Sequence, residues 1–206
     1  MAVCGVVRLP VGVMGLSLRL ALSGAGGPVR ELPPEVVQLL VAVGAPARLG
    51  AHLRLVHDVA CDLSSWLASA HPGVVFDAEA VVFGAATHDV GKVVFPRELS
   101  VPGSRHEAAG RQLLLGRGFP DRLARFAGTH GSWQAAGVGV EDLLVSVADK
   151  VWKGARVEDL ERLLVDRIAG ADGIEVWAAF VSLDDCLQRL AEAADGRLAF
   201  QNGFAV

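Results

Sequence analysis

The sequence predicts an all-α protein, and two observations carry that prediction. From about residue 31 almost to the C-terminus, apolar residues recur at intervals of three and four, the period of helices that bury one face. Strand-like alternation is confined to the residues before 23 and to Val74–Phe76. A chain of 206 residues fits one domain. We therefore expect a single helical domain over residues 31–206, a bundle of about seven helices.

Glycines and capping residues mark where the expected helices begin and end. Gly44 ends the first helix and Gly73 follows the end of the second. Asp77 is a good N-cap for the third helix. Ser104, with Glu107 three residues later, predicts a capping box at the start of the next. The expected helices cover about residues 33–43, 46–70, 77–89, 104–117, 120–130, 140–153, 156–169 and 173–195.

The apolar spacing within two of these segments supports their assignment as helices. In the segment 46–70, the apolar positions fall at Leu49, Leu53, Val56, Ala60, Leu63 and Leu67. In the segment 140–153, they fall at Leu143, Leu144, Val147 and Val151. Both helices are therefore expected to bury a continuous apolar face.

Residues 1–30 are expected to form an N-terminal extension that is either poorly ordered or a hairpin around Gly12–Gly15. The first 27 residues loosely mimic a secretory signal, but Arg19 interrupts the apolar stretch and no small-residue cleavage site follows it. The three cysteines of the chain lie far apart and form no C-x-x-C pair, which favours reduced thiols. We therefore expect a cytoplasmic protein.

The overall composition narrows the class of partner. Charged residues make up 20% of the chain, and no apolar stretch reaches the roughly 18 residues of a membrane span. A net charge of −4 gives no reason to expect a nucleic-acid polymer or a membrane as partner. Only three of the 19 basic residues are lysines, at positions 92, 150 and 153. A lysine offers a phosphate group a compact point charge.

Six side chains able to bind metal occur in order along the expected helices: His57, His88, Asp89, His106, His130 and Asp149. The pair His88-Asp89 ends a helix of small apolar residues, where a buried carboxylate needs compensation such as a cation. Asp89 has two oxygens and can therefore bridge two cations. Imidazoles mixed with carboxylates suit a borderline transition metal better than calcium. His52 is the rival to His57 for the first position, whereas His71, in a turn, and Asp58 are expected to be exposed.

These residues resemble the HD-domain superfamily of metal-dependent phosphohydrolases. The matching stretches are Val56-His57-Asp58-Val59-Ala60, Ala86-Thr87-His88-Asp89-Val90-Gly91-Lys92, His106-Glu107-Ala108-Ala109-Gly110, Phe119-Pro120, His130 and Ala148-Asp149-Lys150. The resemblance covers about residues 45–155. The minimal metal site that it implies is His57, His88, Asp89 and Asp149.

The two further histidines, His106 and His130, match relatives of that superfamily that hold two metals, with Asp89 as the bridge. The resemblance therefore implies two divalent cations: iron, manganese, cobalt or nickel, with magnesium as a further option. The cyclic-dinucleotide phosphodiesterase branch has a His pair and a Gly-Tyr-Pro signature. Here Gly131 follows His130 and the chain contains no tyrosine, so neither feature of that branch is present.

The function expected from this resemblance is hydrolysis of a phosphate ester in a small phosphorylated molecule, such as a nucleotide. The metals would activate the attacking water, Asp89 would bridge them, and Lys92 would contact the phosphate. Two alternatives remain open. Relatives with the same ligands include mixed-valent di-iron oxygenases, and the fold also serves as a non-catalytic binding or regulatory module.

Overall fold

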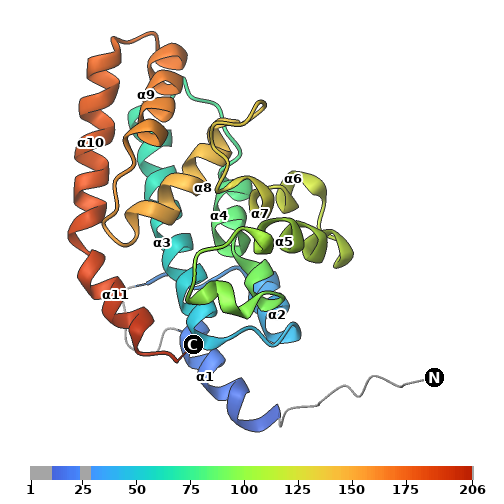
Figure 1. The fold of residues 1–206 in the computed structure, drawn as a ribbon. Helices are drawn as coiled ribbons and strands as arrows, with labels where there is room; N and C mark the ends of the chain where they lie inside the picture. The colour runs from blue at the N-terminus through green and yellow to red at the C-terminus, as the bar shows by residue number, and fades with distance from the viewer. Residues whose placement is uncertain (1–10, 24–28, 206) are drawn as a thin grey trace.

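The computed structural model describes residues 11–23 and 29–205, and among these residues it contains helices and no β-strand (Figure 1). The prediction of an all-α fold is confirmed. The α-helices are α1 (Val11–Ser23), α2 (Pro34–Ala42), α3 (Ala47–Ala70), α4 (Ala78–Thr87), α5 (Arg105–Gly116), α6 (Asp121–Ala124), α7 (Phe126–Thr129), α8 (Val140–Val151), α9 (Glu158–Asp172), α10 (Val176–Glu192) and α11 (Ala194–Asn202). Two 3-10 helices, η1 (Val90–Val93) and η2 (Pro96–Leu99), follow α4.

The centre of the molecule is formed by α3, α4 and α8, which all pack against one another. Helix α3 is buried around its whole circumference between Leu49 and Ala60, because other helices surround it. Helix α4 approaches α7 closely at Gly84, where an added Cβ would lie 2.5 Å from the ring of Phe126. The small residues of α4 therefore allow the close packing that places its C-terminal end deep in the molecule.

Helices α9 and α10 form an antiparallel hairpin along one side of the molecule (Figure 1). Gly173, with a φ of 65°, takes the left-handed conformation that ends α9. His71, expected to be exposed, is instead buried at the end of α3, where it bonds to Asp172 (2.7 Å) and Ser182 (2.9 Å). The turn that holds His71 is thus covered by the hairpin, which sequence periodicity does not reveal.

The N-terminal part differs from the expected extension. Residues 11–23 form the helix α1, not a hairpin, and α1 packs on α3. The contact is close at Gly50, where an added Cβ would lie 2.8 Å from Leu18. Buried Arg54 donates hydrogen bonds to the carbonyls of Ala21, Val29 and Arg30. The rest of the expected extension, residues 1–10 and 24–28, lies outside the described residues.

Several helix ends also differ from the sequence prediction. Asp77 caps α4 as expected, accepting from the backbone N–H of Ala80 (3.0 Å). Ser104 makes no capping hydrogen bond, and Glu98 accepts from the N–H groups of Arg105 and His106 instead. The expected helix 120–130 is two short helices, α6 and α7, and α11 follows α10 as a separate helix. No helix in the described parts is long and apolar enough to cross a lipid bilayer.

Candidate metal centre

Five segments bring six side chains able to bind a metal together in the interior of the helical core. The residues are His52 from α3, His88 and Asp89 from the end of α4, His106 from α5, His130 after α7 and Asp149 from α8. All except Asp149, which is partly buried, are buried. These segments are distant in sequence, so the cluster exists only in the folded chain.

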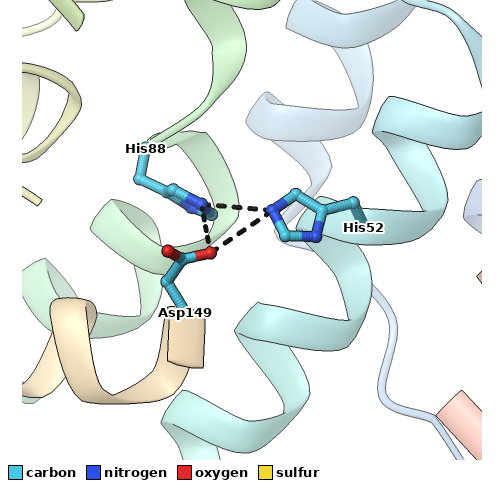
Figure 2. Close-up of side chains that lie close together, drawn as sticks. All are labelled: His52, His88 and Asp149. Atoms are coloured by element: carbon cyan, nitrogen blue, oxygen red, sulfur yellow. Dashed lines mark hydrogen bonds and ion pairs between the residues drawn. The ribbon is translucent and has the colours of Figure 1, made fainter. Parts of the chain in front are cut away.

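Three of these side chains converge on one point, as Figure 2 shows. The Nε2 atoms of His52 and His88 lie 3.3 Å apart, and Asp149 Oδ1 lies 3.6 Å from the first and 3.3 Å from the second. Three ligands of one transition-metal ion, each about 2.0–2.2 Å from it, are separated by about 3 to 3.5 Å. The triad has the spacing of a single cation site.

Asp89 lies between this triad and the two remaining histidines. Its Oδ2 atom lies 3.2 Å from His52 Nε2 and 3.6 Å from His88 Nε2. Its Oδ1 atom lies 3.0 Å from His106 Nε2 and 3.6 Å from His130 Nε2. The two oxygens therefore face two different pairs of imidazoles, which is the arrangement of a carboxylate that bridges two cations.

The comparison with protein families matches the HD domain to residues 50–153, just over half of the chain and a span that includes all six residues. The chain belongs to the HD domain family. The searches of curated proteins and of solved structures gave no match. The resemblance seen in the sequence is therefore confirmed at the level of the family.

Three of the four imidazoles in the cluster of this HD domain are oriented by partners on their far sides, whereas the buried Nδ1 atom of His52 has no hydrogen-bond partner in the described structure. The Nδ1 atom of His88 lies 2.9 Å from the carbonyl of Ala85, and that of His130 lies 3.2 Å from the carbonyl of Phe126. His106 Nδ1 lies 2.6 Å from Glu98 Oε2. Such partners fix the ring and leave Nε2 free to bind a metal. Glu98 thus caps α5 and orients His106 at once, a role that the sequence analysis missed.

Two buried polar atoms in the cluster lack a hydrogen bond to any described residue and are placed so that a cation between them would satisfy both. Asp89 Oδ1 and His106 Nε2 are buried, 3.0 Å apart, and neither makes a hydrogen bond within the described structure. A buried polar atom without a partner is costly. Both atoms would be satisfied by one ion between them, because such ligands lie about 3 Å apart. The donor set of nitrogen and carboxylate oxygen suits a transition metal.

The electrostatics of the cluster keep its two carboxylates ionised and divide its imidazoles. Burial opposes ionisation of Asp89, but the nearby imidazoles, His88 foremost, hold the pKa of its carboxyl well below its ordinary value. The pKa of Asp149 is also lowered: burial opposes this, but the hydrogen bond with His88 and the charges of His88, Lys150 and His52 together outweigh it.

Burial lowers the pKa of His52 and His130, whereas at His88 and His106 the neighbouring carboxylates outweigh burial and raise the pKa, and a bound cation would replace the protons of these two imidazoles. Burial lowers the pKa of His130 to about 4, so that this imidazole is neutral at pH 7. Neutral imidazoles and ionised carboxylates are the ligand forms.

Two lysines lie at the edge of the site. Lys92, predicted to contact phosphate, lies 2.5 Å from Asp89 Oδ2, and Lys150 lies 2.7 Å from Asp149 Oδ2. Lys150 also approaches the ring of Trp133, 5.7 Å from its centroid. Trp133 lines a cavity of about 320 Å³ together with Gly131, Ser132, Gln134, Ala135, Val157 and Asp159. Gly131, the first of these lining residues, follows His130 directly in the sequence.

The structure corrects the first position of the ligand set. His57, predicted to be the first ligand, has Nδ1 3.1 Å from the carbonyl of Val82 and Nε2 3.7 Å from Cys61 Sγ. Five residues turn an α-helix by about 140° beyond one full turn, so His52 and His57 point in different directions. His52, the weaker candidate in the sequence, is the one that joins the cluster.

The residue after His57 is also corrected. Asp58, expected on the solvent side, is buried and forms an ion pair with Arg30 at 3.0 Å. The same carboxylate accepts a hydrogen bond from the backbone N–H of Arg30. Asp58 therefore joins α3 to the segment before α2, and the His57-Asp58 pair lies away from the metal-binding cluster.

Proposed function

We propose that this HD domain is a phosphohydrolase that uses two divalent transition-metal ions held by His52, His88, Asp89, His106, His130 and Asp149. The position of Asp89 carries the proposal. Each of its oxygens faces its own pair of imidazoles, at 3.0 to 3.6 Å. The first ion would take His52, His88 and Asp149 with Asp89 Oδ2, and the second would take His106 and His130 with Asp89 Oδ1.

The bound ions would lower the pKa of a water molecule that attacks the phosphorus atom. Their positive charge would also stabilise the phosphoryl oxygens. The chain's own groups would position the substrate. Lys92 and Lys150 lie at the edge of the ligand set, where an ammonium can hold a phosphoryl oxygen. Trp133 and its cavity would receive the organic part of the substrate. Glu107, whose pKa burial raises, has an oxygen within 4.8 Å of His106 and His130 nitrogens and can hold a proton there.

Metal content and phosphate release, measured together, test the proposal. We expect purified protein to contain up to two transition-metal ions per chain by elemental analysis. We expect it to release phosphate from a panel of small phosphate esters with manganese, cobalt, nickel or magnesium. Asp89→Ala should lose bound metal and activity together, because it removes a ligand shared by both ions.

Asp121→Ala is the matched control, since this exposed carboxylate pairs with Arg111 away from the cluster. It should retain metal and activity. Unchanged metal content in Asp89→Ala would show that the site has been misassigned. Two irons, an oxygen-dependent product and no phosphate release would instead identify an oxygenase on the same ligands. Metal without turnover of any kind would favour a binding module.

A further inference from the structure

A stripe of exposed apolar side chains runs along the start of α10. We call it the α10 patch, and it consists of Ile174, Val176, Trp177, Phe180 and Val181. Trp177 is 69% exposed and Phe180 is 53% exposed. Their spacing of three and four residues places them on one helical face. Exposed apolar residues that are contiguous mark an interaction surface, whereas single ones are ordinary.

A groove lies beside the α10 patch, between α9 and α10. Its volume is about 730 Å³, and its apolar wall is formed by Val165, Val176, Trp177 and Phe180. Its charged wall is formed by Arg156, Glu158, Glu161 and Arg162. The surface thus combines the exposed indole of Trp177 with a groove large enough to receive an indole.

The hairpin that carries this surface is held firmly to the rest of the molecule. His71 connects the end of α3 to Asp172 on α9 and to Ser182 on α10. Asp172 also accepts from the N–H of Gly73 at 2.8 Å. Arg156 pairs with both Glu161 and Asp184, each at 2.7 Å. The surface is therefore preorganised, which lowers the entropic cost of binding.

The described ends of the chain lie far from the α10 patch. Helix α1, helix α11 and the C-terminus lie at one end of the molecule, and the turn between α9 and α10 lies at the other (Figure 1). The patch therefore lies at the end of the molecule away from both described termini, where a second copy of the chain can approach it.

The charges around the groove select the kind of occupant. Glu158 and Arg162 lie four residues apart on α9, and neither forms an ion pair with a described residue. Arg156 and Arg162 lie among three carboxylates, those of Glu158, Glu161 and Asp184, so the surface carries no basic patch for an anionic membrane or a nucleic acid. A second copy of the same surface offers both signs of charge, and a two-fold arrangement uses each pair twice.

We propose that two copies of the chain pair through this surface about a two-fold axis. Trp177 of each copy enters the groove of the other, and Arg162 of each copy faces Glu158 of the second copy. This assembly is independent of the chemistry proposed for the metal centre. Aromatic side chains in the middle of an interface commonly dominate the binding energy.

Sedimentation equilibrium of the full chain over a range of concentrations tests the pairing. We expect a reversible dimer that Trp177→Ala weakens about 30-fold, the loss typical of a central interface aromatic. Val75→Ala is the matched control, because Val75 is 92% exposed outside the patch, and it should leave dimerisation unchanged. Wild-type protein that stays monomeric would overturn the proposal. So would a Trp177→Ala variant that dimerises normally.

A charge-reversal exchange tests the arrangement itself. Glu158→Arg and Arg162→Glu should each weaken dimerisation, because each places like charges opposite one another twice. Mixing the two variants should restore a dimer, since both contacts then join opposite charges. A mixture that stays monomeric would contradict the two-fold arrangement. Binding of wild-type monomer to anionic lipid vesicles, lost in Trp177→Ala, would assign the patch to a membrane instead.

Discussion

At the scale of single residues, the two histidines of α3 give the sharpest test of the metal centre. We expect His52→Ala to lower the bound-metal content, because His52 Nε2 lies 3.2 Å from Asp89 and 3.3 Å from His88. We expect His57→Ala to retain its metal, because His57 contacts Val82 and Cys61. Elemental analysis of both variants after dialysis is the measurement.

Both variants should first be shown to fold, by their helical circular dichroism. His57→Ala is a stringent control, since it removes the same side chain from the same helix. Loss of metal from His57→Ala with retention in His52→Ala would reverse the assignment made from the structure. Equal loss from both would point to a general disturbance of α3.

The same residues show what the sequence could and could not predict about the site. The order of histidines and aspartates was sufficient to select five residues that the structure brings together. It favoured His57 and kept His52 as the rival, because α3 is buried on all sides and apolar residues flank both positions in the sequence. The burial of Asp58 and His71 was also missed, because their partners, Arg30 and Asp172, come from segments that are distant in sequence.

At the scale of elements, the contact between η1 and α5 positions His106. Gly91 lies so close to α5 that an added Cβ would be 1.9 Å from the carbonyl oxygen of His106 and 2.5 Å from the nitrogen of Gly110. These are backbone atoms, so the two elements must separate to admit a methyl group. We expect Gly91→Ala to lower the free energy of unfolding by about 1–3 kcal/mol, the usual cost of overpacking.

The displacement of α5 should also weaken the ion held by His106 and His130 more than the ion held by His52, His88 and Asp149. Denaturant unfolding and metal stoichiometry measure the two effects. Gly116→Ala, in α5, is the control. A Cβ at this position meets open space, so the substitution should leave stability unchanged or raise it slightly. A Gly91→Ala variant with wild-type stability and two ions would refute this account of the glycine.

The elements themselves were predicted best where the apolar period was clear, as in α2, α3, α4 and α8. Helix α1 was missed because its glycines and alternating residues resemble a hairpin, while its packing on α3 decides its structure. Glu98 was missed as a cap because it lies outside the helix that it caps. Tertiary contacts, absent from local sequence, account for both errors.

At the scale of the whole molecule, the proposed metal centre joins helices that are far apart in sequence. His52, Asp89, His106, His130 and Asp149 come from five segments, so bound ions would cross-link the central helices to the part of the domain formed by α5 and α7. Ions that bind the folded state and not the unfolded state stabilise the fold. The same ions would also relieve the unpaired buried atoms of Asp89 and His106.

Removing the ions should therefore lower the melting temperature of the whole domain in a single transition. One ion at a free concentration of about 100 times its dissociation constant contributes about 2.7 kcal/mol, which for about 200 residues corresponds to roughly 5–10 °C. Calorimetry before and after chelation, with metal loss checked by elemental analysis, measures the shift. Asp89→Ala should melt at one temperature with and without chelator, because it holds no ion to lose. An unchanged melting temperature in wild-type protein that has lost its metal would mean that the ions do not hold these helices together.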